Sequence, residues 1–282
     1  YHDNGIKFFS SDGFKLPDSV EKELEELVHK NSFSDCLPGD CEVGKNSKIV
    51  DAAGRYIEFV KATFPRDLSL KNLKIVLDCA NGAGYRVAPL VFEELDAKVE
   101  VYFDKPNGLN INDKCGAMGV GVVQKSVIDH GADVGVALDG DADRVIMVDE
   151  NAQIIDGDTI LAICAHDLMK KGMLKNNKVV ATVMSNLGLI KTLESLGIEV
   201  VLSNVGDRYV IQEMLKHEAN LGGEQSGHLI FLDHNTTGDG LVSALQVLRI
   251  MIETDSRLSD LARIVKKYPQ TMINVKVGKK TP

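Results

Sequence analysis

Three aspartates, Asp139, Asp141 and Asp143, alternate along one short loop, which reads DGDADR from position 139 to position 144. Three anions held this close repel one another unless a cation neutralises them, and carboxylate oxygens suit a hard divalent cation. Mg²⁺ is therefore the expected ion, with the three carboxylates as its ligands. Arg144 follows directly, and its forked guanidinium suits either a phosphate oxygen or the orientation of the carboxylates.

Two other interpretations of this loop compete with the magnesium site. A calcium EF-hand loop shares the D-x-D-x-D spacing, and Glu150 stands at its twelfth position. However, Arg144 occupies the sixth position, where that loop needs glycine, and apolar strand-like runs flank it where an EF-hand has helices. A solvated acidic turn between strands is the simpler alternative, but an ordinary turn needs neither a third aspartate nor the adjacent arginine.

A second group of polar side chains lies in a glycine-rich segment, GGEQSGH at 222–228. Glu224, Ser226 and His228 alternate, so an extended strand would project all three to one face. A carboxylate, a hydroxyl and an imidazole on one face can hydrogen-bond the hydroxyls or an amine of a sugar, and His228 can also exchange protons. A glycine turn that leads into a strand, with its polar residues in water, explains the segment equally well.

Two further loops join strands to helices. In VGDR, at 205–208, Asp207 is expected to be the N-cap of the following helix, and Arg208 is placed to reach a ligand anion. The segment DCANGAG, at 78–84, only loosely matches a dinucleotide-binding fingerprint, because the third glycine and the later acidic partner are absent. Close packing of a helix on a strand is the expected reason for its glycines.

These loops interrupt a regular alternation of apolar strand-like runs and helical periodicity. Helices are expected over 17–30 and 49–64. A first set then has strands at 74–79, 99–103, 133–138 and 144–148, with helices at 84–95 and 119–130. A second set of similar layout has helices at 159–171, 187–196, 209–218 and 241–253, with strands at 178–183, 199–203 and 229–232. The alternation predicts an α/β fold of consecutive domains with mixed or mostly parallel sheets.

The composition narrows the function further. The 282 residues suit about two domains at roughly 100–200 residues each. A net charge of −9 argues against a broad electrostatic grip on nucleic acid, and no apolar run approaches the roughly 18 residues of a membrane span. The five cysteines include no CxxC pair, which favours reduced thiols in a cytoplasmic protein. Cys36 and Cys41 are accordingly expected to be unpaired loop thiols, with a redox pair as the alternative.

Several of these segments, in their order along the chain, resemble one family. DNGIK (3–7), DGDADR, VGDRYV (205–210) and GEQSGH (223–228) are similar to motifs of the α-D-phosphohexomutases. DAAGRYIEF (51–59), CANG (79–82) and TGDG (237–240) resemble the bacterial branch of that family that acts on glucosamine phosphate. The resemblance covers essentially all 282 residues.

The resemblance implies an isomerase that interconverts glucosamine 6-phosphate and glucosamine 1-phosphate, toward UDP-N-acetylglucosamine, through a phosphoserine and a bisphosphate. It implies catalytic roles for Lys7, Arg144 and His228. It implies substrate binding by Glu224, Ser226 and Arg208, and Mg²⁺ binding by Asp139, Asp141 and Asp143. A phosphomannomutase or phosphoglucomutase, or a non-catalytic metal-binding module of mutase descent, is the alternative.

The resemblance also implies a division of the chain. The remainder of a first domain is expected over 1–65, a second domain with the metal loop over 66–158, a third with the sugar-binding loop over 159–268, and a linker over 269–282. The family's serine loop would precede Tyr1 and its last domain would follow Pro282, so these residues alone are expected to be inactive. The expected partner is a small phosphosugar, with no nucleic acid and no membrane, and with a homodimer left open.

Overall fold

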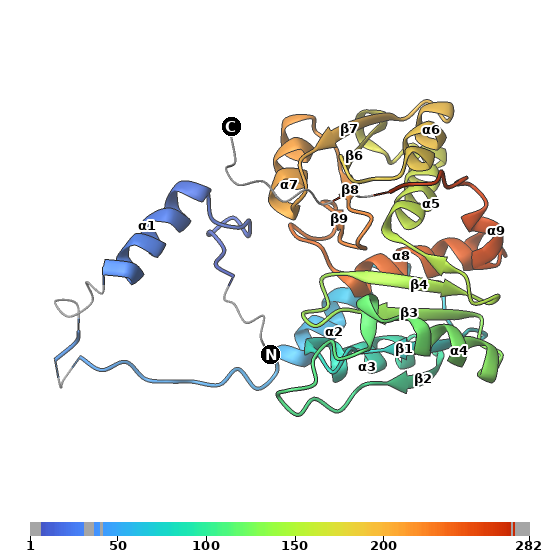
Figure 1. Ribbon diagram of the computed structural model, residues 1–282. Helices are drawn as coiled ribbons and strands as arrows, with labels where there is room; N and C mark the ends of the chain where they lie inside the picture. Colours follow the sequence, from blue (N-terminus) through green and yellow to red (C-terminus); the bar gives the residue numbers. More distant parts are fainter. Residues whose placement is uncertain (1–6, 31–36, 40–41, 272, 274–282) are drawn as a thin grey trace.

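The computed structural model describes residues 7–30, 37–39, 42–271 and 273 (Figure 1). Cys36 and Cys41 lie outside the described residues, so their pairing stays a prediction. The described cysteines, Cys79, Cys115 and Cys164, are buried and free, and burial raises the pKa of each thiol. Among the described residues, none of the helices combines the length and the apolar character needed to cross a bilayer.

The first sheet has five strands in the order β2-β1-β3-β4-β5. They are β1 (Lys74–Asp78), β2 (Lys98–Tyr102), β3 (Val134–Leu138), β4 (Val145–Asp149) and β5 (Ile154–Ile155). β1 pairs in parallel with β2 and β3, whereas the pairs β3-β4 and β4-β5 are antiparallel. α3 (Val87–Glu93) and α4 (Gly121–His130) cover opposite faces, because Ile75 and Leu77 pack in the cluster of α3 and Val76 packs in that of α4.

The second sheet has four strands in the order β7-β6-β8-β9, which repeats the first four positions of the other sheet. They are β6 (Lys178–Thr182), β7 (Glu199–Ser203), β8 (Leu221–Gly223) and β9 (Leu229–Phe231), with only β8-β9 antiparallel. Its helices are α5 (Gly157–Lys170), α6 (Leu187–Ser195) and α7 (Asp207–Lys216). The predicted α/β class, with two similarly arranged mixed sheets, is therefore confirmed.

Helix α8 (Gly240–Glu253) joins the two sheets into one body (Figure 1). It is buried from Gly240 to Met251 and contacts β3, β4, β9 and α5, so a single apolar core extends across both sheets. A helix that is apolar on all sides has to be covered on all sides, which explains this central position. Its one buried cation, Arg249, pairs with Asp167 and Glu253, both at 2.6 Å.

The remaining elements lie outside the two sheets. α2 (Ala52–Ala62) packs on α3 and buries Ile57 and Val60. α1 (Asp18–Lys30) buries none of its residues and lies to one side of the two-sheet body (Figure 1). Short α9 (Leu258–Ala262) follows α8, and three-residue 3-10 turns lie at Ala83–Tyr85, Gly116–Met118 and Lys175–Asn177. The sequence patterns do not indicate β5, β8 and α9, nor the 3-10 turns at Gly116–Met118 and Lys175–Asn177.

Candidate functional site

The acidic loop is the turn of the β3-β4 hairpin, so strands flank it and the EF-hand alternative is wrong. Each aspartate offers a carboxylate oxygen, and the three oxygens lie within 4.8 Å of one another. Asp139 is only 1% exposed, whereas Asp141 is open to solvent and Asp143 is half-buried. Ala142, which lies between Asp141 and Asp143, has a φ of 61°. This left-handed residue closes the turn so tightly that alternate side chains converge.

Arg144 orients the buried member of the triad. Its backbone N–H donates to Asp139 Oδ1 at 3.1 Å and its Nε donates to Asp139 Oδ2 at 2.7 Å. Burial and the charge of Asp143 raise the pKa of Asp139, and the guanidinium works against this rise. Of the two roles expected for Arg144, the structure therefore places it in contact with the carboxylates.

The ammonium group of Lys7 contacts Asp141 and Asp143. Its Nζ donates to Asp141 Oδ2 at 2.7 Å and to Asp143 Oδ2 at 2.9 Å. Burial would lower the pKa of Lys7, but these two hydrogen bonds and charges outweigh it and raise the pKa. The three carboxylates converge, and two of them bind the ammonium of a residue more than a hundred positions away in the sequence, as expected of a cation site. Their all-oxygen donor set suits a hard divalent ion.

The loop at 78–84 packs against the acidic loop. Ala83 N–H donates to the carbonyl of Gly140 at 2.8 Å. A Cβ atom on Gly82 would lie 2.2 Å from the same oxygen, so the two backbones meet where only glycine fits. The sequence pattern had assigned the glycines of 78–84 to helix packing. The spacing alone gave no signal that this loop supports the aspartates, because the contact joins segments more than fifty residues apart.

His228 connects the acidic loop to the second sheet. Its side chain is 5% exposed, with Nδ1 3.5 Å from Asp143 Oδ1 and Nε2 3.8 Å from Asp207 Oδ2. Nε2 has no hydrogen-bond partner among the described residues. Burial would raise the pKa of Asp143, but the contacts with His228 and Lys7 outweigh it and hold that pKa well below its ordinary value. The imidazole thus lies between two carboxylates, one from each half of the body.

Glu224 and Ser226 lie in the β8-β9 turn rather than in a strand. Of the two alternatives that the sequence leaves open, the extended face from Glu224 to His228 is wrong and the glycine turn is present, because Gly227 N–H donates back to the Glu224 carbonyl and Gly227 has a φ of 95°. The two side chains still meet, since the Ser226 hydroxyl donates to Glu224 Oε2 at 3.1 Å. Glu224 Oε1 accepts from Gly206 N–H at 2.8 Å, which ties this turn to the loop before α7.

Asp207 and Arg208 occupy different positions from those expected. Asp207 is the first residue of α7 and Gly206 is the N-cap, so the expected capping role of Asp207 is wrong. The Asp207 carboxylate instead pairs with Lys15, and this ion pair outweighs burial and lowers the pKa of Asp207. Arg208 contacts two carboxylates of α1, those of Asp18 and Glu21, the second at 2.5 Å.

The acidic loop and the β8-β9 turn are joined directly by a backbone hydrogen bond. Val145 N–H, at the end of the acidic loop, donates to the Gly227 carbonyl at 3.1 Å. A cavity of about 500 Å³ lies beside the loop, lined among others by Lys7, Tyr56 and Asp143. This volume is within the range of small-molecule sites. The structure therefore brings all nine candidate residues to the region where the two sheets meet, with Arg208 held by α1 at its edge.

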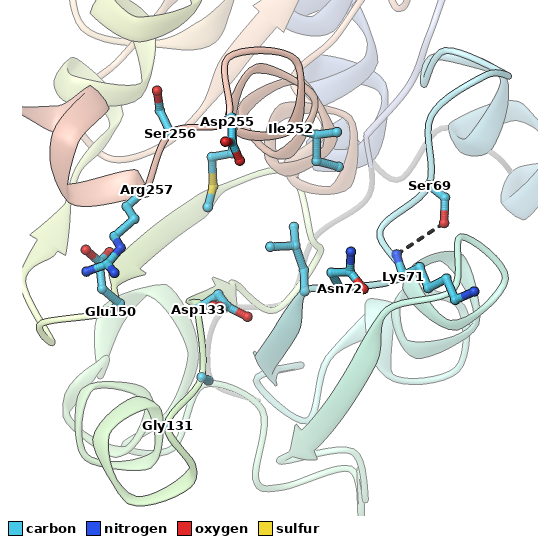
Figure 2. Close-up of a pocket in the computed structure, with 13 residues that line it drawn as sticks. Ser69, Lys71, Asn72, Gly131, Asp133, Glu150, Ile252, Asp255, Ser256 and Arg257 are labelled. Atoms are coloured by element: carbon cyan, nitrogen blue, oxygen red, sulfur yellow. Dashed lines mark hydrogen bonds between the residues drawn. The ribbon is translucent and has the colours of Figure 1, made fainter.

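A larger cavity of about 750 Å³ lies elsewhere (Figure 2). Its lining includes Leu73 and Asp133, which precede β1 and β3, so it opens at the opposite ends of those strands from the acidic loop. Glu150 in its wall accepts a hydrogen bond from the Ser259 hydroxyl at 2.5 Å. None of the nine candidate residues lines it, and size alone therefore does not mark the functional site.

Models of the phosphoglucomutase/phosphomannomutase family match the chain, with alpha/beta/alpha domain II over residues 54–153 and domain III over residues 156–268. The chain belongs to this family.

Particular relatives are similar over most of the chain. It is 71% identical over 280 residues to the phosphoglucosamine mutase of Protochlamydia amoebophila, covering 99% of this chain and 61% of that protein. The chain thus spans about 61% of the length of this curated relative.

Solved structures share the fold. A phosphoglucomutase/phosphomannomutase family protein from Burkholderia thailandensis matches with a TM-score of 0.71 at 23% identity, over 88% of this chain and 52% of that one. The N-acetylphosphoglucosamine mutase of Aspergillus fumigatus, solved with GlcNAc-6P and magnesium, matches with a TM-score of 0.64 at 21% identity, over 79% of this chain and 52% of that one.

Proposed function

We propose that this chain is part of a phosphoglucosamine mutase, which interconverts glucosamine 6-phosphate and glucosamine 1-phosphate through a phosphoserine and a bisphosphate. The observation that carries the proposal is the backbone contact between the acidic loop and the β8-β9 turn, in a chain 71% identical to a phosphoglucosamine mutase. The substrate is a small phosphosugar and the product serves UDP-N-acetylglucosamine synthesis. Free thiols favour a cytoplasmic location.

Mg²⁺ is the proposed ion, held by Asp139, Asp141 and Asp143. When bound, it supplies positive charge where negative charge develops during phosphoryl transfer. Arg144 keeps Asp139 in its ligand orientation through two hydrogen bonds. Lys7, whose raised pKa keeps it charged, places a second cation beside the same loop. Phosphoryl transfer depends mainly on positioning and charge neutralisation, and these groups provide both.

The sugar is proposed to bind between Glu224 and Ser226. A sugar hydroxyl can insert between them by donating to Glu224 Oε2 and accepting from the Ser226 hydroxyl, which are now 3.1 Å apart. His228 is proposed to assist catalysis from its position between Asp143 and Asp207, through contact with these carboxylates and not with the sugar, because its Nε2 atom is buried. Arg208 is proposed to bind a phosphate once it leaves Asp18 and Glu21.

The domain division at 65, 158 and 268, and association into a homodimer, accompany this proposal. The family models at 54–153 and 156–268 support two α/β domains. Sedimentation of the purified protein at several concentrations measures the oligomeric state.

The test is a substrate comparison on the complete gene product. With Mg²⁺ and the sugar bisphosphate as activator, ³¹P NMR follows the conversion of glucosamine 6-phosphate and of the glucose and mannose phosphates. Preference for glucosamine phosphate supports the proposal, whereas preference for mannose or glucose phosphate indicates the related mutases. No turnover of any of them indicates a metal-binding module.

A matched pair of variants connects activity to the acidic loop. Asp141→Asn is expected to lower turnover by about 100-fold, since it removes one ligand charge at the centre of the site. Asp129→Asn removes the same charge from an exposed position on α4 and is expected to leave turnover unchanged. Equal turnover in the two variants would contradict the assignment of the metal site.

A further inference from the structure

A buried carboxylate and a tyrosine from distant segments meet at the N-terminus of α8. Asp239 is 7% exposed and is the N-cap of that helix. Its Oδ1 accepts from the backbone N–H groups of Leu241, at 2.9 Å, and Val242, at 3.0 Å. Its Oδ2 accepts from the hydroxyl of Tyr56 on α2, at 2.9 Å. Both carboxylate oxygens are thus used, one by the helix and one by a residue 183 positions away.

The next residue, Gly240, contacts the backbone of the acidic loop. Its N–H donates to the carbonyl of Ala142 at 2.9 Å. A Cβ atom at this position would lie 2.7 Å from the carbonyl oxygen of Arg144, so the helix and the loop are in contact at both ends of the turn that contains Asp143. The position of this helix end therefore sets the position of Ala142, whose φ of 61° directs the aspartates on either side of it.

The hydrogen bond from Tyr56 stabilises the negative charge of the buried Asp239 carboxylate. Burial and the charge of Asp143 raise the pKa of Asp239, while the hydrogen bonds from Val242 and Tyr56 oppose the rise. A serine or asparagine caps a helix as well as aspartate does. A buried carboxylate that feels the charge of Asp143 is therefore unnecessary for capping alone, and the Tyr56 hydroxyl is the side-chain donor that stabilises it.

We propose that Tyr56 and Asp239 are positioning residues for the metal loop. The Tyr56 hydroxyl orients the Asp239 carboxylate, the carboxylate fixes the first turn of α8, and Gly240 N–H then holds the Ala142 carbonyl and with it the spacing of the three aspartates. The inference rests on the proposed function, in which this loop binds the divalent ion. A second contact, from Gln246 Nε2 to the Thr63 carbonyl at 3.0 Å, keeps α2 and α8 together when the tyrosine hydroxyl is removed.

The test measures metal affinity without any sugar or turnover. Mn²⁺ binding to the chain is followed by electron paramagnetic resonance for the unaltered protein, Tyr56→Phe, Asp239→Asn and the double variant. Each single variant is expected to weaken binding by about 10-fold, the size typical of residues that orient metal ligands. The double variant is expected to bind no more weakly than Asp239→Asn alone, because both substitutions break the same link.

Tyr102→Phe is the matched control. It removes a hydroxyl that lies 2.9 Å from His130 Nε2, in a half-buried tyrosine of the same body, and is expected to leave Mn²⁺ affinity unchanged. A second readout is amide hydrogen exchange at Gly240 without metal, which is expected to be faster in Tyr56→Phe and unaltered in Tyr102→Phe.

The outcomes separate this inference from the proposed function. Unchanged Mn²⁺ affinity in Tyr56→Phe, or equal losses in Tyr56→Phe and Tyr102→Phe, overturns the positioning role. If the unaltered chain binds no Mn²⁺, the metal assignment of the proposed function fails, and exchange at Gly240 then decides the positioning role by itself. Faster exchange supports the role, and unchanged exchange overturns it.

Discussion

Gly82→Ala gives a sharp prediction because a single methyl group would press on the acidic loop. Gly82 has φ −107° and ψ −162°, a conformation that alanine adopts without strain. The added Cβ atom would lie 2.2 Å from the carbonyl oxygen of Gly140. Carbon and oxygen atoms normally approach to about 3.3 Å, so the two loops have to separate by about 1 Å. Any effect of the substitution therefore comes from this contact.

The displacement has two consequences. It weakens the hydrogen bond from Ala83 N–H to the Gly140 carbonyl, now 2.8 Å, and overpacks a buried contact. Overpacking of this kind costs about 2 kcal/mol of unfolding free energy, which corresponds to about 4–8 °C in Tm. It also shifts Gly140, which lies between Asp139 and Asp141, so Mn²⁺ affinity is expected to fall by about 10-fold.

The assay combines calorimetry with Mn²⁺ titration on the same samples. Gly121→Ala is the control, because Gly121 begins α4 and its added Cβ would meet no atom within 4 Å. That variant is expected to keep both Tm and Mn²⁺ affinity, or to gain slightly in Tm. A Gly82→Ala variant with unaltered Tm and affinity would refute the contact, and one with a lower Tm but unaltered affinity would refute its coupling to the metal site.

Three further predictions concern charged groups. Lys7→Met is expected to tighten Mn²⁺ binding by about 5-fold, because the ammonium competes for the carboxylates of Asp141 and Asp143, and a titration showing weaker binding would contradict this. Arg249→Met is expected to lower the free energy of unfolding in urea by about 2 kcal/mol, since it removes the charged hydrogen bonds of a buried guanidinium to Asp167 and Glu253, which keep Lys171 as a partner; a loss below about 0.5 kcal/mol would disprove the estimate. Burial raises the pKa of Asp158 to about 6 from 3.8, so the folded state binds the extra proton between those values and stability falls as the pH rises through them, by at most about 3 kcal/mol. Asp158→Asn cannot ionise, and urea unfolding of both proteins at pH 4.5, 5.5 and 6.5 should show a shallower decline for the variant.

The local part of the site was predictable from the sequence. Apolar runs on both sides of the acidic loop required two buried strands, and a short link between adjacent strands makes a hairpin whose turn gathers alternate side chains. The triad of Asp139, Asp141 and Asp143 follows from that pattern alone. The strand-helix alternation likewise predicted both sheets, because parallel strands need helical connections between them.

The sequence left the segment 224–228 open between an extended strand and a glycine turn, because β8 lacks a strand signature. It has three residues, Leu221 to Gly223, and two of them are glycines, which are depleted in strands. Packing explains why position 222 is glycine, since a Cβ atom there would lie 2.6 Å from the sulfur of Met214 on α7. That contact joins a strand to a helix on one face of the sheet, and no periodic pattern in the sequence indicates it. The alternation of Glu224, Ser226 and His228 therefore indicates the wrong geometry when it is taken as one face of a strand, and the roles of these residues in a site stay a prediction.

The two groups of candidate residues act as one unit because the backbone joins them directly. Val145 N–H donates to the Gly227 carbonyl and Gly157 N–H donates to the Gln225 carbonyl, both at 3.1 Å. His228 contacts Asp143 across the same junction, and α8 buries the core beneath it. A shift of the acidic loop must therefore move the turn that holds Glu224 and Ser226. Substitutions at either group are expected to change both metal affinity and sugar binding, so their effects will not add as those of independent sites would.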